Sequence, residues 1–124
     1  MIGRAEEDEV ALRNWAYIYL SPGFSPEQNT VSTESSGCRF TAIGLDFADK
    51  ERVVDIVHRL VTESGVQMVE LCGGFGPLWI ARVSEAIGGA VPVGSVAYGP
   101  EARQPMLELL ADEQSTSLPH TDVR

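Results

Sequence analysis

A carboxylate, a thiol and three glycines stand close together at residues 70–77, which read ELCGGFGP. Glu70 and Cys72 are two residues apart, so in a strand both side chains point to the same face. A carboxylate near the end of a strand can accept and return a proton in general acid–base catalysis, and a thiol before a helix can act as a nucleophile. The alternatives are a carboxylate held by backbone N–H groups or by an arginine, such as Arg39 or Arg82, and a cysteine that packs as a small hydrophobic residue.

The same glycines do not match the known nucleotide-binding patterns. A P-loop requires Lys and Ser or Thr after its last glycine, whereas Pro77 and Leu78 follow here. The dinucleotide pattern requires a third glycine where Trp79 stands. The start of a helix still offers free N–H groups to a carboxylate or a carbonyl oxygen. We therefore expect the N–H groups of Gly73, Gly74 and Gly76 to contact a substrate oxygen.

Further polar and aromatic residues stand near predicted strand ends. Arg39 opens the second predicted strand, where its guanidinium can fix a carboxylate. Tyr98 closes the fourth, and Tyr19 lies near the end of the first, so both are predicted to reach the substrate. Trp15, Tyr17 and Tyr19 share one face of the first strand, and such an aromatic stripe is more typical of a core or a subunit interface than of a ligand wall.

Cysteine and histidine provide no metal-binding pattern. The chain has two cysteines, Cys38 and Cys72, which form no C-x-x-C pair, and two histidines, His58 and His120, which are widely separated. We expect neither a metal nor a bound cofactor, and we expect the cysteines to be reduced in the cytoplasm.

These residues require a scaffold of alternating strands and helices. Hydrophobic patterning predicts strands at 14–20, 39–47, 66–72 and 90–98 and helices at 48–63, 77–87 and 99–113, with Asp46 or Asp49 as a cap, while residues 25–37 are predicted to form a long loop. The two strand–helix–strand units imply parallel strands. The sequence thus predicts an α/β protein with a mostly parallel four-stranded sheet. Its first strand would be added at one side, in a direction that the pattern leaves open.

Length and turn signals indicate a single domain. The chain has 124 residues, which suits one hydrophobic core. We expect a flexible acidic lead at 1–12, an α/β domain at 13–114 and a flexible tail at 115–124. Ligands of open α/β sheets bind beyond the carboxyl ends of the parallel strands, where this chain has the glycine-rich stretches CGGFGP and YGPE. Both faces of parallel strands are usually covered, so we expect Glu70 to be partly buried.

The charge balance excludes some classes of partner. A net charge of -9 disfavours nucleic acid and anionic membrane surfaces, which both require basic patches. No apolar stretch approaches the length of a membrane span, and the first residues do not resemble a secretion signal. We therefore expect a cytoplasmic protein with a small-molecule substrate.

Four blocks of the sequence carry a resemblance to a known family: NWAYIYLSPGF, GCRF, GVQMVELCGGFGP and VPVGSVAYG. Together they span about residues 14–110, and the chain resembles a small uncharacterised bacterial family, a domain of unknown function. The resemblance implies a compact single-domain α/β protein and no particular activity. It directs attention to Ser21, Gly23, Cys38, Arg39, Glu70, Cys72, Gly73, Gly74, Gly76 and Tyr98.

Two classes of function remain open. The first is a cofactor-independent enzyme of the isomerase, lyase or cyclase type, in which Glu70 transfers a proton, assisted by Cys72, and Arg39 or Tyr98 orients the substrate. No Ser/His/Asp set for hydrolysis is apparent. The second is a non-catalytic module that binds a small ligand or assembles into a homo-oligomer, most simply a dimer, through the stripe of Trp15, Tyr17 and Tyr19 or an edge strand.

Overall fold

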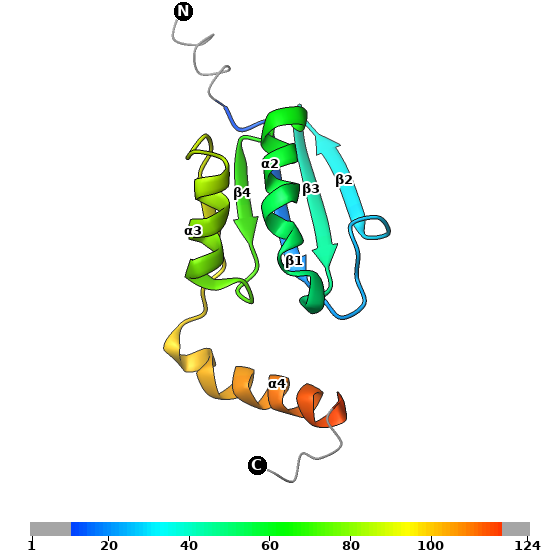
Figure 1. Cartoon of the computed structure of the whole chain (residues 1–124), viewed down its shortest axis with the longest axis vertical. Coiled ribbons are helices and arrows are strands. Elements are labelled where there is room, and N and C mark those ends of the chain that lie inside the picture. Colours follow the sequence, from blue (N-terminus) through cyan, green and yellow to red (C-terminus); the bar gives the residue numbers. More distant parts are fainter. Residues whose placement is uncertain (1–10, 118–124) are drawn as a thin grey trace, which may run out of the picture.

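The computed structural model describes residues 11–117, with side chains through residue 111, and contains one mixed sheet (Figure 1). The predicted lead and tail, including His120, lie largely outside the described residues. The sheet has five strands in the order β2-β3-β1-β4-β5, and their bounds are β1 (Asn14–Leu20), β2 (Thr30–Ser35), β3 (Cys38–Leu45), β4 (Met68–Leu71) and β5 (Val93–Ser95). The prediction of a mixed α/β domain with a mostly parallel sheet is confirmed, and the prediction of four strands is wrong.

The first strand lies at the centre of the sheet and not at one side. β1 is parallel to both β3 and β4, and β4 is parallel to β5. The connection from β3 to β4 therefore passes over β1. This arrangement places the carboxyl ends of four parallel strands at one edge.

The additional strand, β2, lies within the predicted long loop. It runs antiparallel to β3 and forms the outer edge of the sheet. Ser36 and Gly37 join the two strands, with φ values of 53° and 81°. Positive φ at both positions is typical of a two-residue hairpin turn, and Ser-Gly followed by an apolar strand was the signal for it.

The helices follow the predicted pattern with shifted ends. They are α2 (Arg52–Ser64), α3 (Gly76–Ala86) and α4 (Arg103–Ser117), with short 3₁₀ helices η1 (Phe47–Asp49) before α2 and η2 (Pro100–Ala102) before α4. Asp46 caps η1 by accepting a hydrogen bond from the Ala48 N–H. Pro77 stands in the first turn of α3, where a missing N–H costs nothing.

Both crossover helices cover the same face of the sheet. α2 and α3 lie side by side in front of the strands in Figure 1 and contact each other. Beneath them is the core, whose fully buried side chains include Ala16, Ile18, Leu45, Val53, Val57, Val69, Leu71 and Val83. Alternate residues along each strand supply this face, since neighbouring side chains point to opposite sides.

Within residues 11–117, α4 reaches only the carboxyl end of the opposite face, where Met106 and Leu110 line a cavity with Tyr17 and Tyr19, and no helix packs along the rest of it, so the expectation that both faces would be covered is wrong for most of this face. Trp15, Tyr17 and Tyr19 lie on it, half-buried, and Trp15 packs against Phe40 of β3 with 4.5 Å between the ring centroids. We call this side of the sheet the open face.

The last helix leaves the body of the domain. α4 extends beyond the edge toward which β3 and β4 point (Figure 1), and Leu107 and Leu109 on it are exposed. Among the described helices, none combines the length and hydrophobicity needed to cross a membrane.

Candidate functional site

A cavity of about 620 Å³ lies at the carboxyl edge of the sheet, where β1, β4 and β5 end. Its walls include the aromatic side chains of Tyr17, Tyr19 and Tyr98. Cys72, Gly73, Gly74 and Gly76 of the loop after β4 also line it, as do Met106 and Leu110 of α4. Of the predicted site residues, it therefore brings together Tyr19, Cys72, Gly73, Gly74, Gly76 and Tyr98. A cavity of this volume accommodates a molecule of ordinary metabolite or drug size.

Glu70 does not line this cavity itself but lies beside it on the open face, next to Tyr17, which does. It is paired with Tyr17 of β1 on one side and with Gly94 of β5 on the other. Paired residues of parallel strands point to the same face, and Cys72 follows just after the end of β4. A ligand that fills the cavity past Cys72 therefore extends toward the Glu70 carboxylate. Within the described residues, Glu70 forms no ion pair.

Tyr17 connects the carboxylate to the cavity. Burial raises the pKa of its phenol above the usual 10.0, and the negative charges that Cys72, Tyr98 and Glu70 can carry raise it further. These electrostatic interactions mean that the four groups form one cluster, which we call the Tyr17 cluster. At neutral pH the Tyr17 hydroxyl is therefore a hydrogen-bond donor and a proton donor rather than a base.

Cys72 is fixed at the end of β4. Its backbone N–H donates to the Ile18 carbonyl at 3.0 Å, and its Sγ accepts a hydrogen bond from the Leu20 N–H at 3.4 Å. The side chain is half-buried and lines the cavity. The sulfur is thus neither sealed in the core nor freely exposed, which is compatible with contact to a ligand.

The glycine loop presents unused donors. In the described part of the chain, the N–H groups of Gly73 and Gly74 donate to no protein acceptor, whereas the following Phe75 N–H donates to the Cys72 carbonyl. Lys50 reaches the loop and donates to the Gly74 carbonyl at 3.3 Å. A Cβ atom on Gly73 would lie 3.2 Å from the Val96 carbonyl oxygen and 3.5 Å from the Tyr98 ring. Glycine there lets the loop and Tyr98 approach each other closely.

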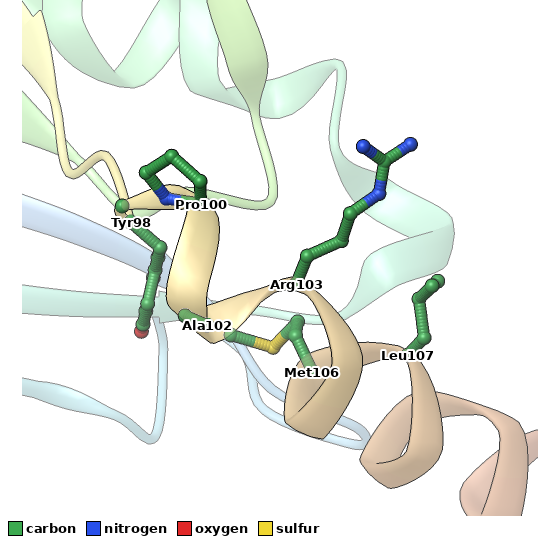
Figure 2. Close-up of a pocket in the computed structure, with 7 residues that line it drawn as sticks. Tyr98, Pro100, Ala102, Arg103, Met106 and Leu107 are labelled. Carbon is green, nitrogen blue, oxygen red and sulfur yellow. The ribbon is translucent and has the colours of Figure 1, made fainter.

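Tyr98 and Met106 form the wall between this cavity and a second, smaller one of about 360 Å³. Figure 2 shows the smaller cavity: the Met106 side chain is directed back toward η2, whereas Arg103 and Leu107 project along one side of α4. Arg103 is the charged residue of that lining. Tyr98 itself is 62% exposed.

Two predicted site residues do not join the site. Arg39 pairs with Asn14 at the start of β1, so it lies at the edge of the sheet opposite to Cys72, and its Nε donates to Glu34 at 3.0 Å. Arg39 therefore lies outside the described cavity, because β3 begins at the edge of the sheet opposite to the one where β1 and β4 end. Ser21 lies just beyond β1, but the bonds described for it are backbone bonds to Leu45 and Phe24.

Arg82 does not hold the Glu70 carboxylate either. Its guanidinium lies 4.7 Å from the centroid of the Trp79 ring, on α3. That helix packs on the covered face of the sheet, whereas Glu70 points to the open face. Neither arginine considered from the sequence therefore neutralises Glu70.

The sequence interpretation missed Tyr17 and the apolar wall. Tyr17 was assigned to a core or interface stripe, yet its pairing with Glu70 makes it part of the site. The alternation of Tyr17 and Tyr19 with the buried Ala16 and Ile18 was the available signal, since it placed both tyrosines on one face. Phe47, Met106 and Leu110 come from segments distant in sequence, and no local motif marks them.

No group of three or more His, Cys, Asp or Glu residues that could hold a metal ion occurs within residues 11–117. Comparison with known proteins found no match among the curated proteins or the solved structures. A family model does match residues 13–111, and its description is a family of unknown function, DUF6506. The match covers all the strands, the glycine loop and the first part of α4. The chain therefore belongs to the DUF6506 family.

Proposed function

We propose that this protein is a small-molecule enzyme that moves a proton on a carbonyl substrate, in an isomerase, lyase or cyclase reaction. The reaction would take place in the cavity at the carboxyl edge of the sheet. The observation that carries the proposal is the position of Glu70 and Cys72: Glu70 is paired with Tyr17 on the open face, and Cys72, just after β4, lines the cavity together with Tyr17. A carboxylate in such a position, without an ion-pair partner in the described chain, is available to a substrate.

The proposed step uses groups that are already in place. The Glu70 carboxylate takes a proton from the carbon next to the substrate carbonyl, and the electron pair of that C–H bond moves onto the carbonyl oxygen. The N–H groups of Gly73 and Gly74, which have no acceptor in the described chain, donate to the resulting enolate oxygen. Tyr17 and Tyr98 supply hydroxyl donors beside it. Return of the proton to the same or another carbon completes the reaction.

Exchange of substrate protons with solvent tests this step directly. In D₂O, proton NMR of a simple ketone such as 4-phenylbutan-2-one measures loss of the signals next to its carbonyl. The wild-type protein should accelerate the loss, and Glu70→Gln should abolish the acceleration while leaving the fold intact. Glu63→Gln removes an exposed carboxylate on α2 and is the matched control. Equal acceleration by wild type and Glu70→Gln would contradict the proposal.

A second candidate is an assembly module, and the open face favours it. Trp15 and Phe40 pack together there, and Val31 of the edge strand β2 is 64% exposed on the same side. Such a face could pair with a second copy of the chain. Solution mass measurements test this candidate with Trp15→Ala as the disrupting variant. A monomer at high concentration argues against it.

The proposed setting is the cytoplasm. Cys38 and Cys72 are both free thiols in the structure, and reducing compartments keep them so. The partner is a small molecule rather than nucleic acid or an anionic membrane, since the net charge of -9 repels both.

A further inference from the structure

The large cavity lacks charged side chains. Among the described residues that line it, none is Lys, Arg, His, Asp or Glu. The walls consist of aromatic and aliphatic groups, and the polar groups that reach it are tyrosine hydroxyls, the Cys72 thiol, Ser95 and the backbone of the glycine loop. Such a lining favours an apolar body with few hydrogen-bonding atoms.

The charges around the cavity disfavour an anion. Glu70 stands beside it and interacts electrostatically with Tyr17. Two described cations lie beside the cavity without lining it: Lys50 donates to the Gly74 carbonyl, and Arg103 lines the smaller cavity. The net charge of -9 adds a repulsive field over longer distances.

The donors present in the cavity suit a neutral acceptor. The N–H groups of Gly73 and Gly74 donate to no acceptor in the described chain, and a carbonyl oxygen can accept from them without bringing a charge. A carboxylate would accept the same bonds but would lose much of its hydration without a cation to replace it. The free-energy balance therefore favours a ketone or aldehyde over an acid of the same shape.

We propose that this cavity selects uncharged, largely apolar carbonyl compounds and rejects carboxylates and phosphates. This inference extends the proposed function to a class of substrate and rests on it for the identity of the site. It also implies that the apolar part of the ligand lies between the tyrosines and the α4 side chains Met106 and Leu110.

A pair of ligands of nearly equal shape tests the inference by binding alone. 4-Phenylbutan-2-one and 3-phenylpropanoate differ chiefly in a methyl group replaced by a charged oxygen. Titration calorimetry or ligand-observed NMR should show the ketone binding at least about tenfold more tightly, which corresponds to about 1.4 kcal/mol. Equal or tighter binding of the acid would overturn the proposal.

A variant that should gain affinity for the acid tests the inference more sharply. Ala97 is exposed and lines the cavity, so Ala97→Arg places a guanidinium there without removing a group used in the proposed step. The variant should bind 3-phenylpropanoate several-fold more tightly than the wild type does, so that the preference for the ketone over the acid falls. An arginine that leaves the affinity for the acid unchanged would contradict the inference. Ala48→Arg, an exposed residue of η1 outside the lining, is the control.

A variant of Arg103 distinguishes binding in the smaller cavity from binding in the large one. If the acid binds the wild-type protein as tightly as the ketone and Arg103→Gln abolishes that binding, the ligand occupies the groove at Arg103 and the selectivity proposal is overturned. Failure of selectivity is distinct from failure of the proposed function, which concerns proton exchange in Glu70→Gln. A protein that prefers the ketone but exchanges no protons would be a binding module with this selectivity.

Discussion

Tyr17 and Glu70 occupy directly paired positions on the neighbouring parallel strands β1 and β4. The pairing places a phenol and a carboxylate side by side on the open face. The carboxylate of Glu70 stands three residues before Gly73, where the glycine loop begins. Neither residue is brought there by a local motif, since they are separated by most of the domain in sequence. The crossover from β3 over β1 to β4 creates this pair and with it the candidate site.

The first prediction concerns the titration of Tyr17. Its pKa should lie above the usual 10.0, with burial as the main cause, followed by Cys72, Tyr98 and Glu70. Cys72→Ser should lower it more than Glu70→Gln does. The folded chain then holds the phenol proton more tightly than the unfolded chain does, which contributes to the free energy of unfolding. This contribution is present in full below pH 10.0 and is lost as pH rises through the folded pKa. Tyrosinate absorbance, assigned with Tyr17→Phe, measures the midpoint; a value at or below the usual one would refute the cluster.

The second prediction compares two glycines on the open face. A Cβ atom on Gly44 would lie 2.6 Å from Phe24 Cδ2 and 3.1 Å from the Tyr19 ring, whereas a Cβ on Gly94 would meet nothing within 4 Å. Gly44→Ala should therefore destabilise the fold by about 1–3 kcal/mol, because the rings that pack over it must move.

Gly94→Ala is the matched control and should change the free energy of unfolding by less than about 0.5 kcal/mol. Denaturant titrations of both variants measure the difference. Similar stabilities of the two variants would mean that Tyr19 and Phe24 do not hold their described positions over β3.

The third prediction concerns the entry into α3. Gly76 has a φ of 77°, a conformation that costs a residue with a Cβ atom roughly 1–2 kcal/mol. Gly76→Ala should destabilise the protein by about this amount, and Gly76→Asn should cost less because asparagine tolerates the left-handed region. Thermal unfolding of the two variants gives the comparison, and an alanine variant as stable as the wild type would contradict the described turn.

The fourth prediction is a dependence of stability on acid pH. Hydrogen bonds from the backbone N–H groups of Gly23 and Ala48 hold the pKa of Asp46 below its usual 3.8. The folded chain then releases the Asp46 proton more readily than the unfolded chain does, so the ionised carboxylate contributes to the free energy of unfolding. This contribution is present above pH 3.8 and is lost as pH falls through the lower folded pKa.

Asp46→Asn should remove this part of the acid dependence, as measured by denaturant unfolding between neutral and acid pH. Asp49→Asn changes an exposed carboxylate in the same 3₁₀ turn and serves as the control. An acid dependence that both variants share with the wild type would show that the Asp46 bonds contribute nothing.

Local sequence signals predicted most of the helices and strands but not which strands lie next to each other in the sheet. The apolar stripe of Val53 and Val57 predicted α2, and Pro77 predicted the start of α3, because both depend on residues within a few positions. The central place of β1 could not be read from the sequence, since strand order depends on pairing between distant segments. The hairpin of β2 was hidden by its polar composition, which an exposed edge strand tolerates.

The site was predictable to the same extent. The glycine loop and the shared face of Glu70 and Cys72 follow from spacing along one strand. The misplacement of Arg39 arose because a residue at the start of a strand was assumed to reach the edge where strands end. Met106 and Leu110 depend on where α4 leaves the sheet, which their own residues do not determine.

The central claim is that the carboxyl-edge cavity, with Gly73 and Gly74 as donors, is where a carbonyl ligand binds. Titration of 4-phenylbutan-2-one into ¹⁵N-labelled protein, followed by amide NMR, tests it most directly. The account predicts saturable shifts that are largest for the Gly73 and Gly74 amides and are absent at Arg39 on the opposite edge of the sheet. Saturable shifts confined to Trp15 and Phe40 on the open face, or no shift at the two glycines at ligand saturation, would contradict it.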